Sequence, residues 1–79
     1  MTREEFDRRL DAIERSVASG YGEPPPTREA LDAAYADLAR LAREPSTQQD
    51  RARRRSVGAA AEMLERVYAA LNLPVPDAS

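Results

Sequence analysis

The sequence predicts an all-α protein, an antiparallel helical hairpin or small three-helix bundle with a long arginine-rich third helix. Three segments carry apolar residues at the helical spacing of three and four, and capping residues or prolines mark their ends. No run alternates apolar and polar residues with the period of a strand. We therefore expect residues 1–79 to form a single helical domain. Its helices should span about 3–19, 28–43 and 47–71, with a Gly/Pro linker at 20–27 and a tail at 72–79.

The first helix should begin at Thr2 and Glu5, which form a capping box because hydroxyl and carboxylate can satisfy free backbone amides. Its apolar stripe has steps of four, three and four residues and comprises Phe6, Leu10, Ile13 and Val17. Gly20 followed by Tyr21 predicts a left-handed cap at its end, since glycine adopts positive φ without strain.

The second helix should follow the stretch GYGEPPPT, whose three prolines cannot continue a helix and favour a stiff extended spacer. A ligand for a proline-binding groove is the less favoured interpretation of this stretch. Thr27 is the expected N-cap, and Pro45 should end the helix. The apolar stripe comprises Leu31, Tyr35, Leu38 and either Leu41 or Ala42, with Ala34 alongside.

The third helix has two candidate caps, Ser46 and Thr47, with Gln49 or Asp50 completing a capping box. Asn72 tolerates the left-handed conformation and should end the helix before a proline. The apolar stripe comprises Val57, Ala60, Ala61, Leu64, Val67, Tyr68 and Leu71.

The composition leaves little margin for a stable monomer. The 79 residues include one Phe, no Trp and no Cys, and much of the 42% hydrophobic content is alanine. Area scaling gives burial of ~7,900 Å², and its apolar part contributes on the order of 120 kcal/mol. Ordering the chain costs a similar amount, at ~1.5 kcal/mol per residue. We therefore expect a protein partner or self-association.

The composition and the lack of a long apolar stretch predict that the chain has no membrane partner. Charged residues make up 33% of the chain, its net charge is -2, and no apolar stretch approaches the length of a membrane span. The N-terminus MTREEFDRR lacks the apolar core of a signal peptide. We expect a cytoplasmic protein.

The stretch RARRRS at residues 51–56 places Arg51, Arg53, Arg54 and Arg55 near the start of the third helix. Residues 46–58 contain these four arginines and one acid, so the segment carries a local charge of +3. Four cations at a helix N-terminus oppose the helix dipole. This unfavourable placement needs an explanation.

Three explanations are open, and in the first of them Arg40 and Arg43 add to the same end of the bundle. In the first, the arginines are counter-ions within the bundle, and Arg51, Arg54 and Arg55 lie near Glu4, Asp7 and Asp11. In the second, they bind an acidic partner protein, because a third helix of ~37 Å overhangs a second helix of ~24 Å. In the third, they bind nucleic acid. The third is the least favoured, because the sequence has neither interleaved aromatic residues nor a helix-turn-helix pattern.

Catalysis is not expected, because the chain has no His, Cys or Lys to act as general base or nucleophile. Glu62 and Glu65 could share a metal ion, but a Glu62–Arg66 pair on a solvated face is favoured. No glycine-rich phosphate loop is present, and Gly58 beside three alanines predicts a close helix crossing, with a helix kink as the second choice. We expect no catalytic residues, no metal, no cofactor and no small-molecule substrate.

These observations predict a small non-catalytic protein–protein interaction module: an adaptor, regulator or chaperone-like subunit, typical of bacteria or phage. It should act through helix packing in a homo-oligomer or a heteromeric complex. The partner-binding residues should be Arg40, Arg43, Arg51, Arg53, Arg54 and Arg55. The core or the oligomer face should comprise Phe6, Leu10, Ile13, Val17, Leu31, Tyr35, Leu38, Val57, Leu64, Val67, Tyr68 and Leu71. The alternative is a small nucleic-acid-binding protein that uses the arginine cluster at 51–55.

Overall fold

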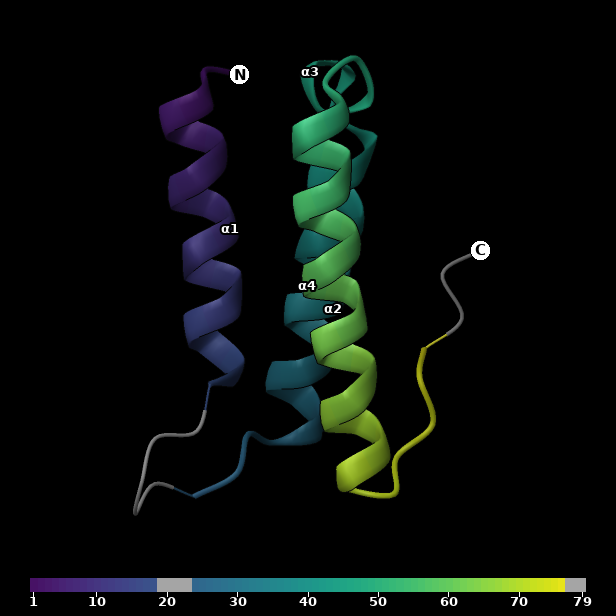
Figure 1. The fold of residues 1–79 in the computed structure, drawn as a ribbon. Coiled ribbons are helices and arrows are strands. Elements are labelled where there is room, and N and C mark those ends of the chain that lie inside the picture. The colour runs from purple at the N-terminus through teal and green to yellow at the C-terminus, as the bar shows by residue number, and fades with distance from the viewer. Residues whose placement is uncertain (19–23, 77–79) are drawn as a thin grey trace.

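The computed structural model describes residues 1–18 and 24–76, and within them the chain is an all-α bundle without strands. The helices are α1 (Arg3–Val17), α2 (Arg28–Arg43), α3 (Pro45–Gln48) and α4 (Arg51–Ala70). The three long helices lie side by side, with α2 antiparallel to both α1 and α4 (Figure 1). The short α3 lies at the end of the bundle where α2 turns into α4 (Figure 1).

The first two helices begin at the predicted threonine caps. The hydroxyl of Thr2 accepts a hydrogen bond from the backbone N–H of Glu5 at 3.1 Å. Thr27 does the same for Ala30 at 3.1 Å. Helix α1 ends at Val17, earlier than the expected residue 19, because Ala18 already has an extended backbone. The predicted cap at residues 20–21 lies outside the described residues.

The predicted third helix is wrong at its beginning, because residues 45–70 form two helices rather than one. Pro45 begins the single turn α3, since its ring fixes a helical φ and the first turn requires no donor there. Asp50 then has an extended backbone, which ends this turn. Its carboxylate accepts the N–H groups of Ala52 at 2.9 Å and Arg53 at 3.3 Å and thereby caps α4. Consequently α4 is only ~30 Å long, and the expected long overhang is absent.

The end of α4 has the predicted left-handed residue. Asn72 has a φ of 57°, and its N–H donates to the carbonyl of Ala69 at 3.1 Å. The N–H of Leu73 donates to the carbonyl of Tyr68 at 2.9 Å. These two bonds form a Schellman motif, which satisfies carbonyls that have no partner within the helix.

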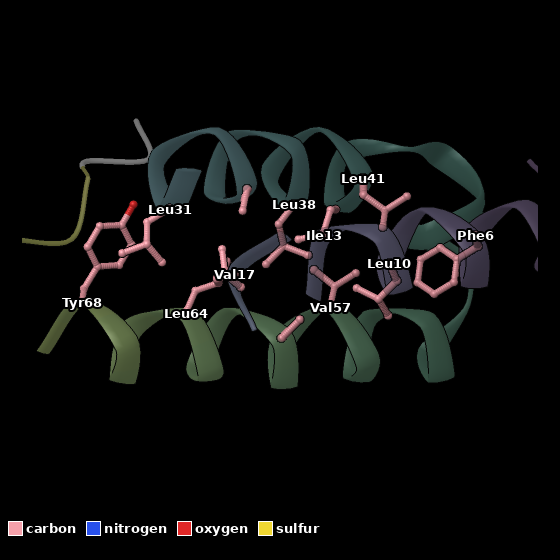
Figure 2. Close-up of a cluster of buried hydrophobic side chains, with 12 residues drawn as sticks. Phe6, Leu10, Ile13, Val17, Leu31, Leu38, Leu41, Val57, Leu64 and Tyr68 are labelled. Carbon is pink, nitrogen blue, oxygen red and sulfur yellow. The ribbon is translucent and has the colours of Figure 1, made fainter. Parts of the chain in front are cut away.

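The core lies between the three long helices (Figure 2). Tyr35, Val67 and Leu71 are only partly buried, so they lie at its edge. Leu41 rather than Ala42 continues the buried stripe of α2. The twelve buried apolar residues are Phe6, Leu10, Ile13, Val17, Leu31, Ala34, Leu38, Leu41, Val57, Ala60, Leu64 and Tyr68.

The close helix crossing expected at Gly58 is absent within the described chain. Gly58 is exposed, and a Cβ atom built on it would meet no other atom within 4 Å. The small residue that faces the core is instead Ala60, which is buried. Packing between the helices of this chain therefore does not require a glycine at position 58.

Helix α2 is the centre of the bundle, because α1 and α4 both pack mainly against it and meet each other less closely. The C-terminal tail, residues 71–76, leaves α4 on the side away from α1 (Figure 1). The α2–α4 pair consequently has one side covered by α1 and a second side that α1 does not reach.

Candidate protein-interaction surface

The four clustered arginines of α4 do not share one environment, because Arg53 turns towards the core. Its side chain is only 11% exposed, and its guanidinium carbon lies 5.3 Å from the centre of the Phe6 ring. It donates to the carbonyl of Met1 at 3.1 Å, and its Nε lies 3.4 Å from a carboxylate oxygen of Asp50. Arg53 therefore ties the start of α1 to the start of α4, and it is not part of the exposed arginine surface.

The predicted counter-ion arrangement is wrong for the described residues. Asp7 and Asp11 pair with arginines of their own helix, and no ion pair joins α1 to Arg51, Arg54 or Arg55. The physical reason is the placement of α1, which lies beside Arg53. The other three arginines lie elsewhere around α4.

Arg51, Arg54 and Arg55 are exposed. Arg54 donates to the carbonyl of Gln48 at 2.7 Å, which places it beside the end of α3. Arg51 is three and four residues from the other two, so the three side chains share one helix face. Within the described part of the chain, none of the three has a carboxylate within ion-pairing distance. The capping carboxylate of Asp50 offsets part of their conflict with the helix dipole.

The two arginines of α2 also differ from each other. Arg40 pairs with Asp37 of the same helix, so part of its charge is already neutralised. Arg43 is exposed and lines a groove between α2 and α4. Arg43 therefore joins the exposed arginines of α4 at the end of the bundle that carries α3.

We call this groove the α2–α4 groove. Its volume is about 390 Å³, and its apolar floor comes from α2 and α4 without any contribution from α1. The partly buried ring of Tyr35 packs edge-on against Tyr68, with ring centres 6.2 Å apart. The residues that line the groove are Tyr35, Leu38, Ala39, Ala42, Arg43, Gln48, Val57 and Ala61.

The side of α4 that borders this groove carries a basic residue at one end and an acidic residue at the other, Arg54 and Glu65. Arg43 and Arg54 lie at the end near α3, where Gln48 contacts Arg54 and lines the groove. Asp32 lies towards the other end and accepts a hydrogen bond of 2.6 Å from the hydroxyl of Tyr68. Glu65, two turns beyond Val57 on α4, is exposed. Asp32 is paired with Arg28 at 3.8 Å, so the charge contrast along this side comes from α4, with Arg54 near α3 and Glu65 towards the other end.

A second hollow extends this face along the outer side of α2. It is lined by Asp32, Tyr35, Ala36, Ala39, Arg40, Arg43 and, from the C-terminal tail, Pro76. Three of these residues also line the α2–α4 groove. The uncovered face therefore continues from α4 across α2 to the tail.

The sequence patterns did not reveal this groove. One sequence feature could have indicated the groove. Ala39 and Ala42, three residues apart, form a second row of small residues beside the main apolar stripe of α2. The side of the hairpin that remains open depends on where α1 packs. That placement is a tertiary property, and no local pattern encodes it.

The described residues contain no group of three or more acidic side chains placed to hold a metal ion, and Glu62 and Glu65 are both exposed. None of the described helices combines the length and the apolar character that a membrane crossing requires. The chain matches no protein-family model, and no match to it was found among curated proteins or solved structures.

Proposed function

We propose that the chain is a small non-catalytic protein–protein interaction module that binds another protein surface on its α2–α4 groove. The observation that carries this proposal is the groove itself, an apolar floor with Arg43 and Arg54 at one end. Small side chains such as Ala39 and Ala42 allow a helix backbone to approach closely. Arginine forms forked contacts with carboxylates, so the basic end favours an acidic partner.

The geometry favours protein over nucleic acid. Nucleic-acid affinity depends on the number of phosphates that cations neutralise. The inward turn of Arg53 leaves three exposed arginines in the cluster instead of four. The floor of the groove is apolar, which suits a protein side chain better than a phosphate backbone. An adaptor, regulator or chaperone-like subunit would use such a surface.

Site-specific photo-crosslinking tests this proposal. A benzophenone amino acid at position 39 lies in the groove, and one at position 33 lies on the exposed outer surface of the same helix. We expect illumination in cells to give discrete polypeptide adducts from position 39 and none from position 33. Adducts with nucleic acid alone, or equal yields of adducts at both positions, would contradict the proposal.

A further inference from the structure

We infer that the occupant of the α2–α4 groove is a second copy of this chain, packed in an antiparallel two-fold dimer. This inference rests on the proposed function and identifies the partner. In this dimer α4 of one copy lies antiparallel to α4 of the other. Arg54 of each copy then lies opposite Glu65 of the other copy.

The first support is the order of residues along the exposed face of α4. Arg54, Gly58, Ala61 and Glu65 follow one another at spacings of four, three and four, so they lie on one side of the helix. Reversing the direction of the helix exchanges Arg54 with Glu65 and Gly58 with Ala61. The midpoint of this pattern, between residues 59 and 60, is level with the part of the groove that Val57 and Ala61 line. The face is therefore complementary to itself.

The charges select one of two possible symmetries. Two identical faces can pack about a two-fold axis that runs either along the helices or across them. An axis along the helices would place the basic end of one copy, with Arg43 and Arg54, against the basic end of the other. An axis across the helices places Arg54 of each copy against Glu65 of the other. Arg54 and Glu65 are eleven residues apart, so each lies roughly 8 Å from the centre of the face.

Among the described residues, neither charge already has an ion-pair partner. Within residues 1–18 and 24–76, no ion pair involves Arg54 or Glu65. The hydrogen bond from Arg54 to the carbonyl of Gln48 leaves other guanidinium donors available. Both residues can therefore form a new ion pair between copies.

The surface area of the single chain fits this arrangement. The chain exposes 5515 Å², whereas a compact monomer of its mass exposes roughly 4,700 Å². The excess of about 800 Å² is close to the area that each partner contributes to a standard interface. Residues outside the helices contribute to this excess together with the uncovered α2–α4 face.

The dimer also gives Gly58 a role. A glycine in the middle of a helix costs about 0.5–1 kcal/mol relative to alanine, and no contact within the described chain requires one here. Gly58 lies beside the proposed crossing point of the two α4 helices. There its missing side chain lets the two backbones approach closely.

Sedimentation equilibrium of the full chain at micromolar and higher concentrations tests the inference. We expect a dimer, and we expect Arg54→Glu and Glu65→Arg each to raise its dissociation constant about tenfold at low salt, because two ion pairs become repulsive. Mixing these two variants should restore the dimer, since the mixed pair again has opposite charges at both contacts. Arg8→Glu, on the exposed face of α1, is the matched control and should leave the dissociation constant unchanged.

Gly58→Leu supplies a second variant that does not weaken the helix. Leucine has a higher helix propensity than glycine, so the chain should remain folded while the bulky side chain blocks the crossing. A wild-type chain that stays monomeric would overturn the inference. So would a dimer that tolerates Gly58→Leu, or one that mixing the two charge variants does not restore. If the wild type is monomeric but position 39 crosslinks to a different protein, the dimer fails and the proposed function stands.

Discussion

Replacing Tyr68 by Phe should reveal how the buried end of the bundle is held together. The ring of Tyr68 is fully buried, and its hydroxyl donates to a carboxylate oxygen of Asp32 at 2.6 Å. A hydrogen bond to a charged group contributes about 1.5–3 kcal/mol. Asp32 is half exposed and lies 3.8 Å from the guanidinium of Arg28, so water and this cation replace part of the lost contact. We expect Tyr68→Phe to lower the free energy of unfolding by about 1–2 kcal/mol at pH 7.

The same substitution should change how stability depends on alkaline pH. Burial of the ring, together with the hydrogen bond to Asp32 and that residue's charge, raises the pKa of Tyr68 far above its ordinary value. An unfolded tyrosine releases its proton near pH ~10, whereas the folded chain retains it. The contribution of protonated Tyr68 to the free energy of unfolding is therefore complete below pH ~10. Above that pH it falls by about 1.4 kcal/mol per pH unit. The stability curves of wild type and Tyr68→Phe should meet about one unit above pH ~10.

Urea unfolding followed by circular dichroism between pH 7 and pH ~11.5 measures both effects, because arginine does not titrate in this range. The chain contains no Lys and no Cys, so tyrosines dominate the titration above pH ~9. Tyr35→Phe is the matched control, since it leaves the Tyr68–Asp32 hydrogen bond in place. An alkaline loss of stability that is equally steep in wild type and Tyr68→Phe would refute this reasoning.

Three further predictions concern the core and the arginines. Leu64→Ala should lower the free energy of unfolding by ~2–5 kcal/mol, because Leu64 is fully buried; an unchanged urea midpoint would contradict this. Arg53→Gln should lower it by about 1–2 kcal/mol, whereas Arg54→Gln should change it by less than ~0.5 kcal/mol, as thermal melts can show. Titrating the chain with duplex DNA at physiological salt should show only weak binding. Tight binding that is lost in the Arg51→Gln/Arg54→Gln double variant would instead favour the nucleic-acid alternative.

Local sequence signals were sufficient to predict much of this fold. Thr2 and Thr27 could be predicted as caps because a hydroxyl can accept the N–H three residues later, and both bonds are present. Asn72 could be predicted to end α4 because few residues adopt positive φ without strain. Each of these features depends on atoms within one helical turn, so the sequence contains all the information that determines it.

The start of α4 could not be predicted in the same way, because several residues compete there. Ser46, Thr47 and Asp50 are all competent caps, and each implies a different first residue for the helix. The choice of Asp50 depends on Pro45, which begins a separate turn, and on the burial of Thr47 within that turn. Burial is decided by tertiary packing, so the single long helix was a reasonable but wrong prediction.

The orientation of the arginines could not be predicted for the same reason, because it also depends on tertiary packing. Extending the stripe of α4 backwards from Val57 reaches both Arg53 and Arg54, and periodicity alone cannot choose between them. The placement of α1 decides between them, because the Phe6 ring lies against the Arg53 guanidinium and the carbonyl of Met1 accepts a hydrogen bond from it. Once α1 occupies that side, Arg54 must lie on the open side beside the α2–α4 groove. The packing that neutralises one arginine within the chain therefore leaves its neighbour available for a partner.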